Sequence, residues 1–140
     1  MTDLLEEQHA QVVLGLLGGN AALTVLDGVV PDPWPPLPYV LVYTQTAWPA
    51  GAAGIGNALD HNSVTCVTTG YVHCVGETAA ACRAVAMQVR SSLLDAQPTI
   101  AGRNCTRLTL DDAGAPVKDE TTGRAVMDMT VVCSFTSVPG

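Results

Sequence analysis

The segment from Arg124 to Thr136 has an apolar side chain at every second position, a pattern that constrains the fold more than any other in the sequence. Successive side chains of a β-strand point to opposite faces, so this period of two predicts a strand with one apolar face. The residues of that face are Ala125, Met127, Met129, Val131, Cys133 and Phe135. Such a strand requires a sheet and a further layer that covers its apolar side.

A helix at 77–94 is the best candidate for the covering layer. Burial of its three large apolar side chains, Val85, Val89 and Leu93, would contribute about 5–9 kcal/mol to folding before the entropy of folding is subtracted. Pro98 prevents continuation of the helix. The apolar residues of its predicted inner face are Ala81, Cys82, Val85, Ala86, Val89 and Leu93.

The N-terminal part of the sequence predicts a second helix and then an extended stretch. Asp3 and Glu6 have the spacing of a capping box, and apolar residues at helical spacing indicate a helix at about 4–17. Residues 21–26 are expected to form a short helix or a turn. The prolines that follow force an extended path, which leads into a strand at 39–43.

Two more strands and two long connections complete the expected elements. Strands are predicted at Ser63–Val75 and Asn104–Leu110, and residues 46–61 are predicted to form a long loop. The polar segment 111–123 is predicted to form a hairpin whose tip projects roughly 20 Å. The expected fold class is α+β, with one mixed or antiparallel sheet of about four to five strands, packed by two helices, with a long β-hairpin arm. Residues 1–140 are expected to form a single domain.

The composition favours a chain whose surface is partly covered by other subunits. Charged residues make up 14% of the sequence, against roughly 25% in ordinary soluble domains. The alternative is a neutral monomer rich in Ala and Gly. The net charge is −7, and Lys118 and five arginines carry all the positive charge, so tight binding of DNA or RNA is not expected.

No targeting or membrane segment is expected. The first residues are acidic where a secretory signal is basic, and the longest stretch without charged residues, Pro33–Leu59, is rich in proline and glycine. The cysteines are therefore expected to be reduced and mostly buried thiols. They are Cys66, Cys74, Cys82, Cys105 and Cys133.

The sequence offers no catalytic or metal site, so neither an enzyme activity nor a cofactor is expected. Cys66 and Cys74 would lie about 26 Å apart on one strand, too far to share an ion. No Gly-x-Ser-x-Gly motif is present, and the histidines have no obvious Ser or Cys partner in sequence. The glycines at 51–56 lack the lysine and the strand-to-helix context of a phosphate loop. The acidic residues between 111 and 120 miss the spacing of an EF-hand.

The order of these elements resembles the tail terminator (tail-completion) proteins of long-tailed, siphovirus-type bacteriophages. The segments that carry the resemblance are Val25-Leu26-Asp27-Gly28-Val29-Val30-Pro31 and Leu37-Pro38-Tyr39-Val40-Leu41-Val42. The family shows a similar Asp-x-Val-Pro turn followed by a Pro-Tyr-Val strand. The strand–helix unit Val64–Leu94 and the closing hairpin also match, so the resemblance covers nearly the whole chain.

The resemblance implies a structural virion protein that forms a homohexameric ring. Such a ring sits at the head-proximal end of the tail tube, ends tube polymerisation and joins the tail to the head connector. The implied partners are further copies of the chain, the tail tube protein and the head–tail connector or stopper protein. Genomic DNA would pass through the lumen without specific binding, which suits an acidic protein, and no membrane would be involved. The implied location is the tail or neck of the virion, after assembly in the host cytoplasm.

Candidate contacts between subunits or between rings lie in and near the two long connections. They are Trp48, Arg103, Arg107, Asp111, Asp112, Lys118, Asp119 and Glu120. Tryptophan is enriched among residues that dominate binding energy, and the arginines are suited to pair with acidic residues of a neighbour. Two alternatives remain open: a head–tail connector or stopper ring protein of the neck, and a small-ligand binding module that uses the apolar sheet face.

Overall fold

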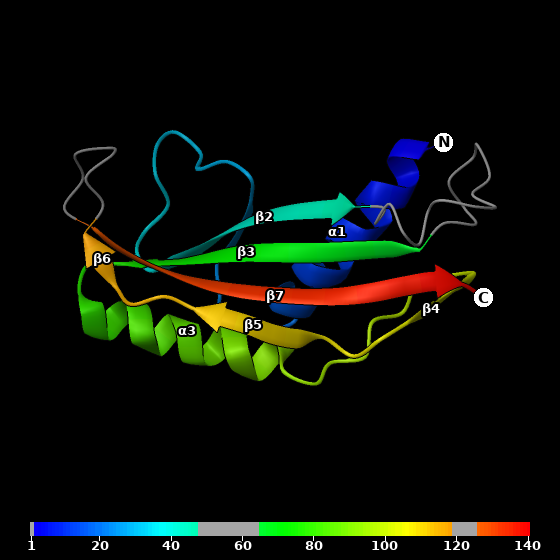
Figure 1. Cartoon of the computed structure of the whole chain (residues 1–140). Coiled ribbons are helices and arrows are strands. Elements are labelled where there is room, and N and C mark those ends of the chain that lie inside the picture. The colour runs from blue at the N-terminus through cyan, green and yellow to red at the C-terminus, as the bar shows by residue number, and fades with distance from the viewer. Residues whose placement is uncertain (1, 48–64, 119–125) are drawn as a thin grey trace.

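The protein is described by a computed structural model that covers residues 2–47, 65–118 and 126–140. The chain order is α1 (Thr2–Gly18), β1 (Val25–Asp27), β2 (Tyr39–Ala47), β3 (Cys66–Gly76), α3 (Ala79–Leu93), β4 (Arg103–Cys105), β5 (Thr109–Ala113), β6 (Val117–Lys118) and β7 (Met127–Pro139). All described strands belong to one sheet (Figure 1). The expected α+β fold with a single mixed sheet is confirmed, but the sheet has seven strands rather than the four to five expected.

Strand β7 organises the sheet. Its 13 residues pair along one edge with β3 and along the other with β4, β5 and β6, all antiparallel. Strand β2 continues the sheet beyond β3, and β1 adds the one parallel pairing among the described strands. Figure 1 shows β7 crossing the whole width of the molecule between β3 and β5.

Both described helices pack on the same face of the sheet. The alternation predicted for β7 is confirmed, because Met129, Val131, Cys133 and Phe135 are buried on this face. The helix α3 buries the predicted stripe of Cys82, Val85, Ala86, Val89 and Leu93 against them. It begins two residues later than expected, because the Thr78 side chain caps its first turn by accepting a hydrogen bond from the Ala81 amide (3.1 Å).

A close approach between α1 and the sheet depends on a glycine. A Cβ atom built on Gly70 of β3 would lie 2.9 Å from Cys133 Sγ and 3.4 Å from Val13 Cγ1. The absence of a side chain at this position therefore lets α1 settle onto β3 and β7. None of the described helices is long and apolar enough to cross a membrane.

The cysteines behave as expected for small apolar residues. None of the five forms a disulfide bond, and all are buried except Cys105, which is half-buried. Burial raises the pKa of the Cys74 thiol to about 12 and that of the Cys133 thiol to about 11. These thiols therefore stay protonated at neutral pH.

A buried polar chain joins α1 to the far end of β7. His9 Nδ1 lies 2.6 Å from the Leu5 carbonyl, so this nitrogen carries the proton and donates it. His9 Nε2 accepts from the Ser137 hydroxyl (2.6 Å), and Ser137 Oγ accepts in turn from Arg103 Nε (2.9 Å). The imidazole also stacks on Phe135 with ring centroids 5.8 Å apart. Burial, with Arg103 nearby, lowers the pKa of His9 despite its bond to Leu5, so the ring stays neutral.

Two parts of the sequence-based assignment are wrong. Residues 21–26 were expected to be helix or turn, but Val25–Asp27 forms β1, which pairs in register with Val40–Val42. The predicted strand Asn104–Leu110 is two strands, β4 and β5. The chain leaves the ladder between them, since the Leu108 amide donates to the Ala96 carbonyl and the Leu108 side chain is buried.

The segment 111–118 does not project as a hairpin arm. Asp111 and Asp112 lie in β5, with a bulge between Leu110 and Asp112, and β6 continues along β7. The edge of β7 is long enough to pair both segments, and pairing satisfies backbone groups that a projecting arm would leave to water. Residues 119–123 lie outside the described residues. Of the predicted loop 46–61, Thr46 and Ala47 end β2, and 48–61 lie outside the described residues.

Candidate functional site

The face of the sheet opposite the helices is the main candidate for an interaction surface. Here it is called the open face, and it consists of the outward-pointing side chains of β2, β3, β5 and β7. No described helix covers it, and the exposed fractions of Tyr43 and Tyr71 are 45% and 39%. Exposed aromatic residues on a sheet face are typical of surfaces that bind other proteins.

Four side chains form a straight row across the open face. Tyr43 of β2 is the cross-strand partner of Tyr71 of β3, Tyr71 is the partner of Val132 of β7, and Val132 is the partner of Asp112 of β5. We call these four residues the tyrosine row. Three strand spacings separate its ends, a length of about 14 Å. The row is thus apolar and aromatic over three strands and ends in an exposed carboxylate.

A histidine–aspartate pair lies beside the tyrosine row. His73 Nδ1 is 2.8 Å from Asp128 Oδ2 and 3.3 Å from the Thr130 hydroxyl. The Tyr43 ring meets His73 edge to face, with centroids 5.5 Å apart. The pair thus joins β3 to β7 on the open face and lies in contact with the Tyr43 ring of β2.

The proline-rich segment covers one end of the open face. Tyr39, Val75 and Val126 are buried there in a small apolar cluster, against which side chains of residues 26–41 pack. The same segment carries Val29 and Trp34, whose exposed fractions are 67% and 54%. Large exposed apolar or aromatic side chains therefore occur both on the tyrosine-bearing strands and on this covering segment.

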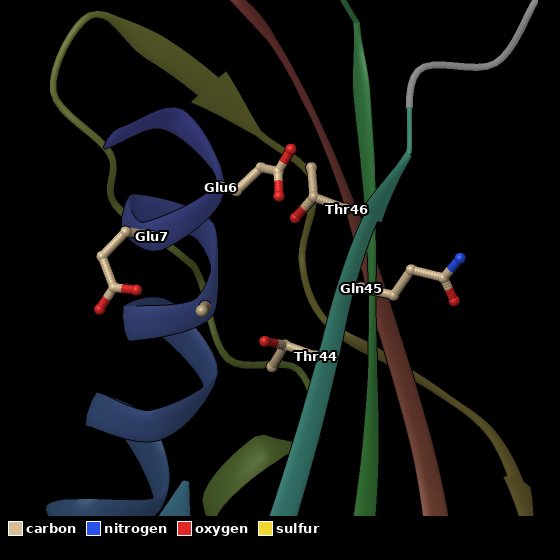
Figure 2. Close-up of a pocket in the computed structure, with 6 residues that line it drawn as sticks. Glu6, Glu7, Thr44, Gln45 and Thr46 are labelled. Atoms are coloured by element: carbon tan, nitrogen blue, oxygen red, sulfur yellow. The ribbon is translucent and has the colours of Figure 1, made fainter. Parts of the chain in front are cut away.

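A second feature is a cleft of about 390 Å³ between α1 and the end of β2. Figure 2 shows Glu6 and Thr44 pointing into the space between helix and strand, while Gln45 points away from the helix. The lining residues are Glu6, Glu7, Ala10, Thr44, Gln45 and Thr46. Ligand pockets of this size usually have apolar walls with a few polar groups, whereas this lining is mostly polar and acidic.

The structure separates the site residues predicted from the sequence. Trp48, Asp119 and Glu120 lie outside the described residues. Asp111 and Asp112 are exposed on β5, and Lys118 is exposed at the end of β6. Their role in contacts between subunits stays a prediction.

The two predicted arginines have partners within the chain. Arg103 donates through Nε and Nη2 to Ser137 Oγ and O, at 2.9 and 3.2 Å. Arg107 Nη1 donates to the Asp95 carbonyl at 2.9 Å. Arg103 is half-buried and Arg107 is exposed, so Arg107 is the more accessible of the two to a neighbouring molecule.

Sequence reasoning did not identify Tyr43 and Tyr71 as site residues. The alternation of each strand places both side chains on the outer face, which was the available signal. Their pairing depends on the register between β2 and β3, which the pattern within one strand does not contain.

Metal binding finds no support in the described part of the chain. Among residues 2–47, 65–118 and 126–140, no three His, Cys, Asp or Glu side chains come together as a group that would hold an ion. Structural and catalytic zinc sites need at least three such ligands.

Comparison with solved structures reveals a similar fold. The chain is similar to a chain from the virion of the native gene transfer agent (GTA) particle, with a TM-score of 0.63 and 21% sequence identity over 94% of both chains. At this identity the likeness shows a shared fold. The sequence matches no family model and gives no significant match among curated proteins.

Proposed function

We propose that this chain is a non-enzymatic structural protein of a phage-like virion that forms a ring at the head-proximal end of the tail tube. The ring ends tube polymerisation and joins the tail to the head connector. The observation that carries this proposal is the fold likeness to a chain of the GTA virion, which extends over 94% of each chain and leaves no domain of either unmatched.

The open face supports self-assembly. It carries exposed tyrosines over neighbouring strands of a chain with only 14% charged residues. A ring needs a head-to-tail interface made of two different surfaces of the same subunit. A domain with helices on one side of its sheet and an open face on the other has two such surfaces on opposite sides.

The net charge of −7 suits a ring through which DNA passes. Phosphates would be repelled rather than bound by an acidic lumen, so DNA would move without specific contacts. A DNA-gripping protein of this size would instead carry clustered Lys and Arg.

A head–tail connector or stopper ring of the neck is the second candidate. It shares the ring assembly and differs in its partner, because a stopper would bind the head side without ending tube growth. The two candidates therefore separate in an assay of tube length.

The deciding experiment follows polymerisation of tail tube protein with and without the purified chain. Electron micrographs are expected to show shorter tubes of uniform length, each with a ring of extra density at one end. A chain that leaves tube length unchanged but co-purifies with the connector would replace the terminator proposal with the stopper. A chain that does neither would overturn both.

A further inference from the structure

One flank of α3 and its C-cap residue form a stripe of four side chains, of which three are exposed and one, Arg90, is half-buried. Arg83, Met87, Arg90 and Leu94 follow one another at spacings of four, three and four residues, so they form a line along the helix. Met87 and Leu94 are 65% and 56% exposed, although both are large apolar residues. We call these four residues the α3 stripe.

The α3 stripe has no partner within the described chain. The side of α3 that faces α1 is marked by Gln88 and Ser92, both bonded to Asn20. The α3 stripe lies on the other flank. Neither the Arg83 nor the Arg90 side chain makes a hydrogen bond or an ion pair with another described residue. The stripe therefore combines an exposed cation, Arg83, and a half-buried one, Arg90, with two exposed apolar side chains.

The α3 stripe and the tyrosine row match in length. Arg83 and the C-cap residue Leu94 are eleven positions apart, which corresponds to about 16 Å at the rise of a helix, and the tyrosine row is about 14 Å long. The order of residue types along the two lines is also complementary. The α3 stripe begins with a cation and ends with a leucine, and the tyrosine row begins with the Asp112 carboxylate and ends with the Tyr43 ring.

The α3 stripe and the tyrosine row carry opposite charges. The outward-pointing residues of β2, β3 and β7 in the described ranges include no Lys or Arg, and the acidic end of the row is exposed at Asp112. Asp112 uses one oxygen, Oδ1, to accept from the Ala113 amide at 2.8 Å, which leaves Oδ2 available. The α3 stripe contains no acidic residue.

We propose that the α3 stripe of one copy packs on the tyrosine row of the next copy, so that a second copy of this chain is the occupant of the open face. Arg83 pairs with Asp112, Met87 packs on Val132, Arg90 lies over the Tyr71 ring, and Leu94 contacts Tyr43. An arginine over a tyrosine ring is a favourable cation–π arrangement. This inference rests on the proposed ring and names the interface that builds it.

The two surfaces lie on different sides of each subunit, one on the helix layer and one on the open face. Every copy can therefore use both at once, which gives a head-to-tail series that closes if the rotation between copies divides the circle. A twofold dimer would instead bring identical surfaces together.

A charge-swap experiment tests this interface. Arg83→Glu and Asp112→Lys are each expected to weaken self-association at least about tenfold, because each places like charges together in the contact. The double variant Arg83→Glu/Asp112→Lys restores the opposite charges in reversed order and is expected to return to within about threefold of the wild type. Native mass across a concentration series measures all three, and circular dichroism verifies that each variant is folded.

Glu7→Lys is the matched control. Glu7 is exposed on α1, away from both surfaces, and its change alters the net charge as much as Asp112→Lys does. It is expected to leave the mass distribution unchanged. Equal weakening by Glu7→Lys would overturn the interface, because it would show an effect of total charge.

Three other outcomes would contradict the proposed interface. Single variants that associate like the wild type, or a double variant that remains as weak as the singles, overturn the pairing of α3 with the tyrosine row. A wild-type chain that stays monomeric at its highest soluble concentration also overturns the interface. The terminator proposal is decided separately by tube length, so the two can fail independently.

Discussion

The two faces of one sheet have different compositions and different environments. On β7, Val131 is buried beneath the helices, and the adjacent Val132 lies on the open face in the tyrosine row. The helix-covered face is apolar, with valines, cysteines and Phe135, against which His9 of α1 stacks, whereas the open face mixes tyrosines, threonines and carboxylates. The comparison teaches that the helix-covered face supplies the core that stabilises the fold, whereas the open face is not needed for that core.

The two faces should differ most in the free energy of unfolding that is lost when a charged side chain is introduced. Val131→Asp places a carboxylate in the core without a partner, which should cost more than about 4 kcal/mol and leave the chain unfolded. The neighbouring Val132→Asp should cost less than about 1 kcal/mol, because water reaches the side chain. Urea unfolding followed by circular dichroism measures both. Equal losses would show that the two faces are buried alike.

The second effect concerns packing of α1 on the sheet. Gly70→Ala adds a methyl group 2.9 Å from Cys133 Sγ, closer than van der Waals contact allows, and should lower the free energy of unfolding by about 1–3 kcal/mol. Thr69→Ala, one residue away on the open face, serves as the comparison and should cost about 0.5 kcal/mol. A neutral Gly70→Ala would mean that neither Cys133 nor Val13 of α1 packs tightly against this position.

The third effect is a pH dependence of stability that His9, buried between α1 and the sheet, should cause. The folded-state pKa of His9 is lowered from its ordinary value of 6.5 by burial, so below pH 6.5 the unfolded chain takes up a proton that the folded chain resists. Stability should be complete above pH 6.5 and fall as the pH drops below it, by at most about 1.4 kcal/mol per pH unit. The urea midpoint measured from pH 7.5 to pH 5 gives this slope.

His9→Gln provides the control for that slope. The variant should be less stable at every pH by about 1–3 kcal/mol, since it disturbs the bonds to Leu5 and Ser137, but it should lack the part of the slope that His9 contributes. A slope identical to that of the wild type would assign the pH dependence to other groups.

The smallest effect on stability is expected for a substitution on the open face. Tyr71→Ser removes one member of the row and should change the free energy of unfolding by less than about 1 kcal/mol, the range of single cross-strand pairs. Self-association of the same variant should weaken about tenfold or more, because a central aromatic contact is lost. A large loss of stability with unchanged association would reverse the assignment of the two faces.

Elements with strong internal periodicity could be predicted from the sequence. The pattern of β7 and the apolar stripe of α3 are repeated over several turns or pleats, so each was placed within a few residues. Strand β1 was missed because three residues do not establish a period, and it exists through its pairing with Val40–Val42. Asp111 and Asp112 look like turn residues but lie in a strand, because the free edge of β7 pairs with them.

The candidate site could be predicted only in part. Low charge indicated a covered surface, and Asp112 was named as a contact residue, but the row to which Asp112 belongs joins residues from four strands. Partners that are distant in sequence are not encoded in any local pattern. His9 and Ser137, for example, are separated by 128 positions.

The central place of β7 has a consequence for biosynthesis. The sheet pairs β7 with β3, β4, β5 and β6, all of which precede it in the chain. During translation these segments emerge before the strand that joins them, so the sheet cannot close until β7 has left the ribosome. Contacts between distant residues also slow folding, because long loops must close first. The nascent chain therefore exposes its apolar β3 and α3 segments from their emergence until β7 is available, and chaperones that bind such segments would act in that interval.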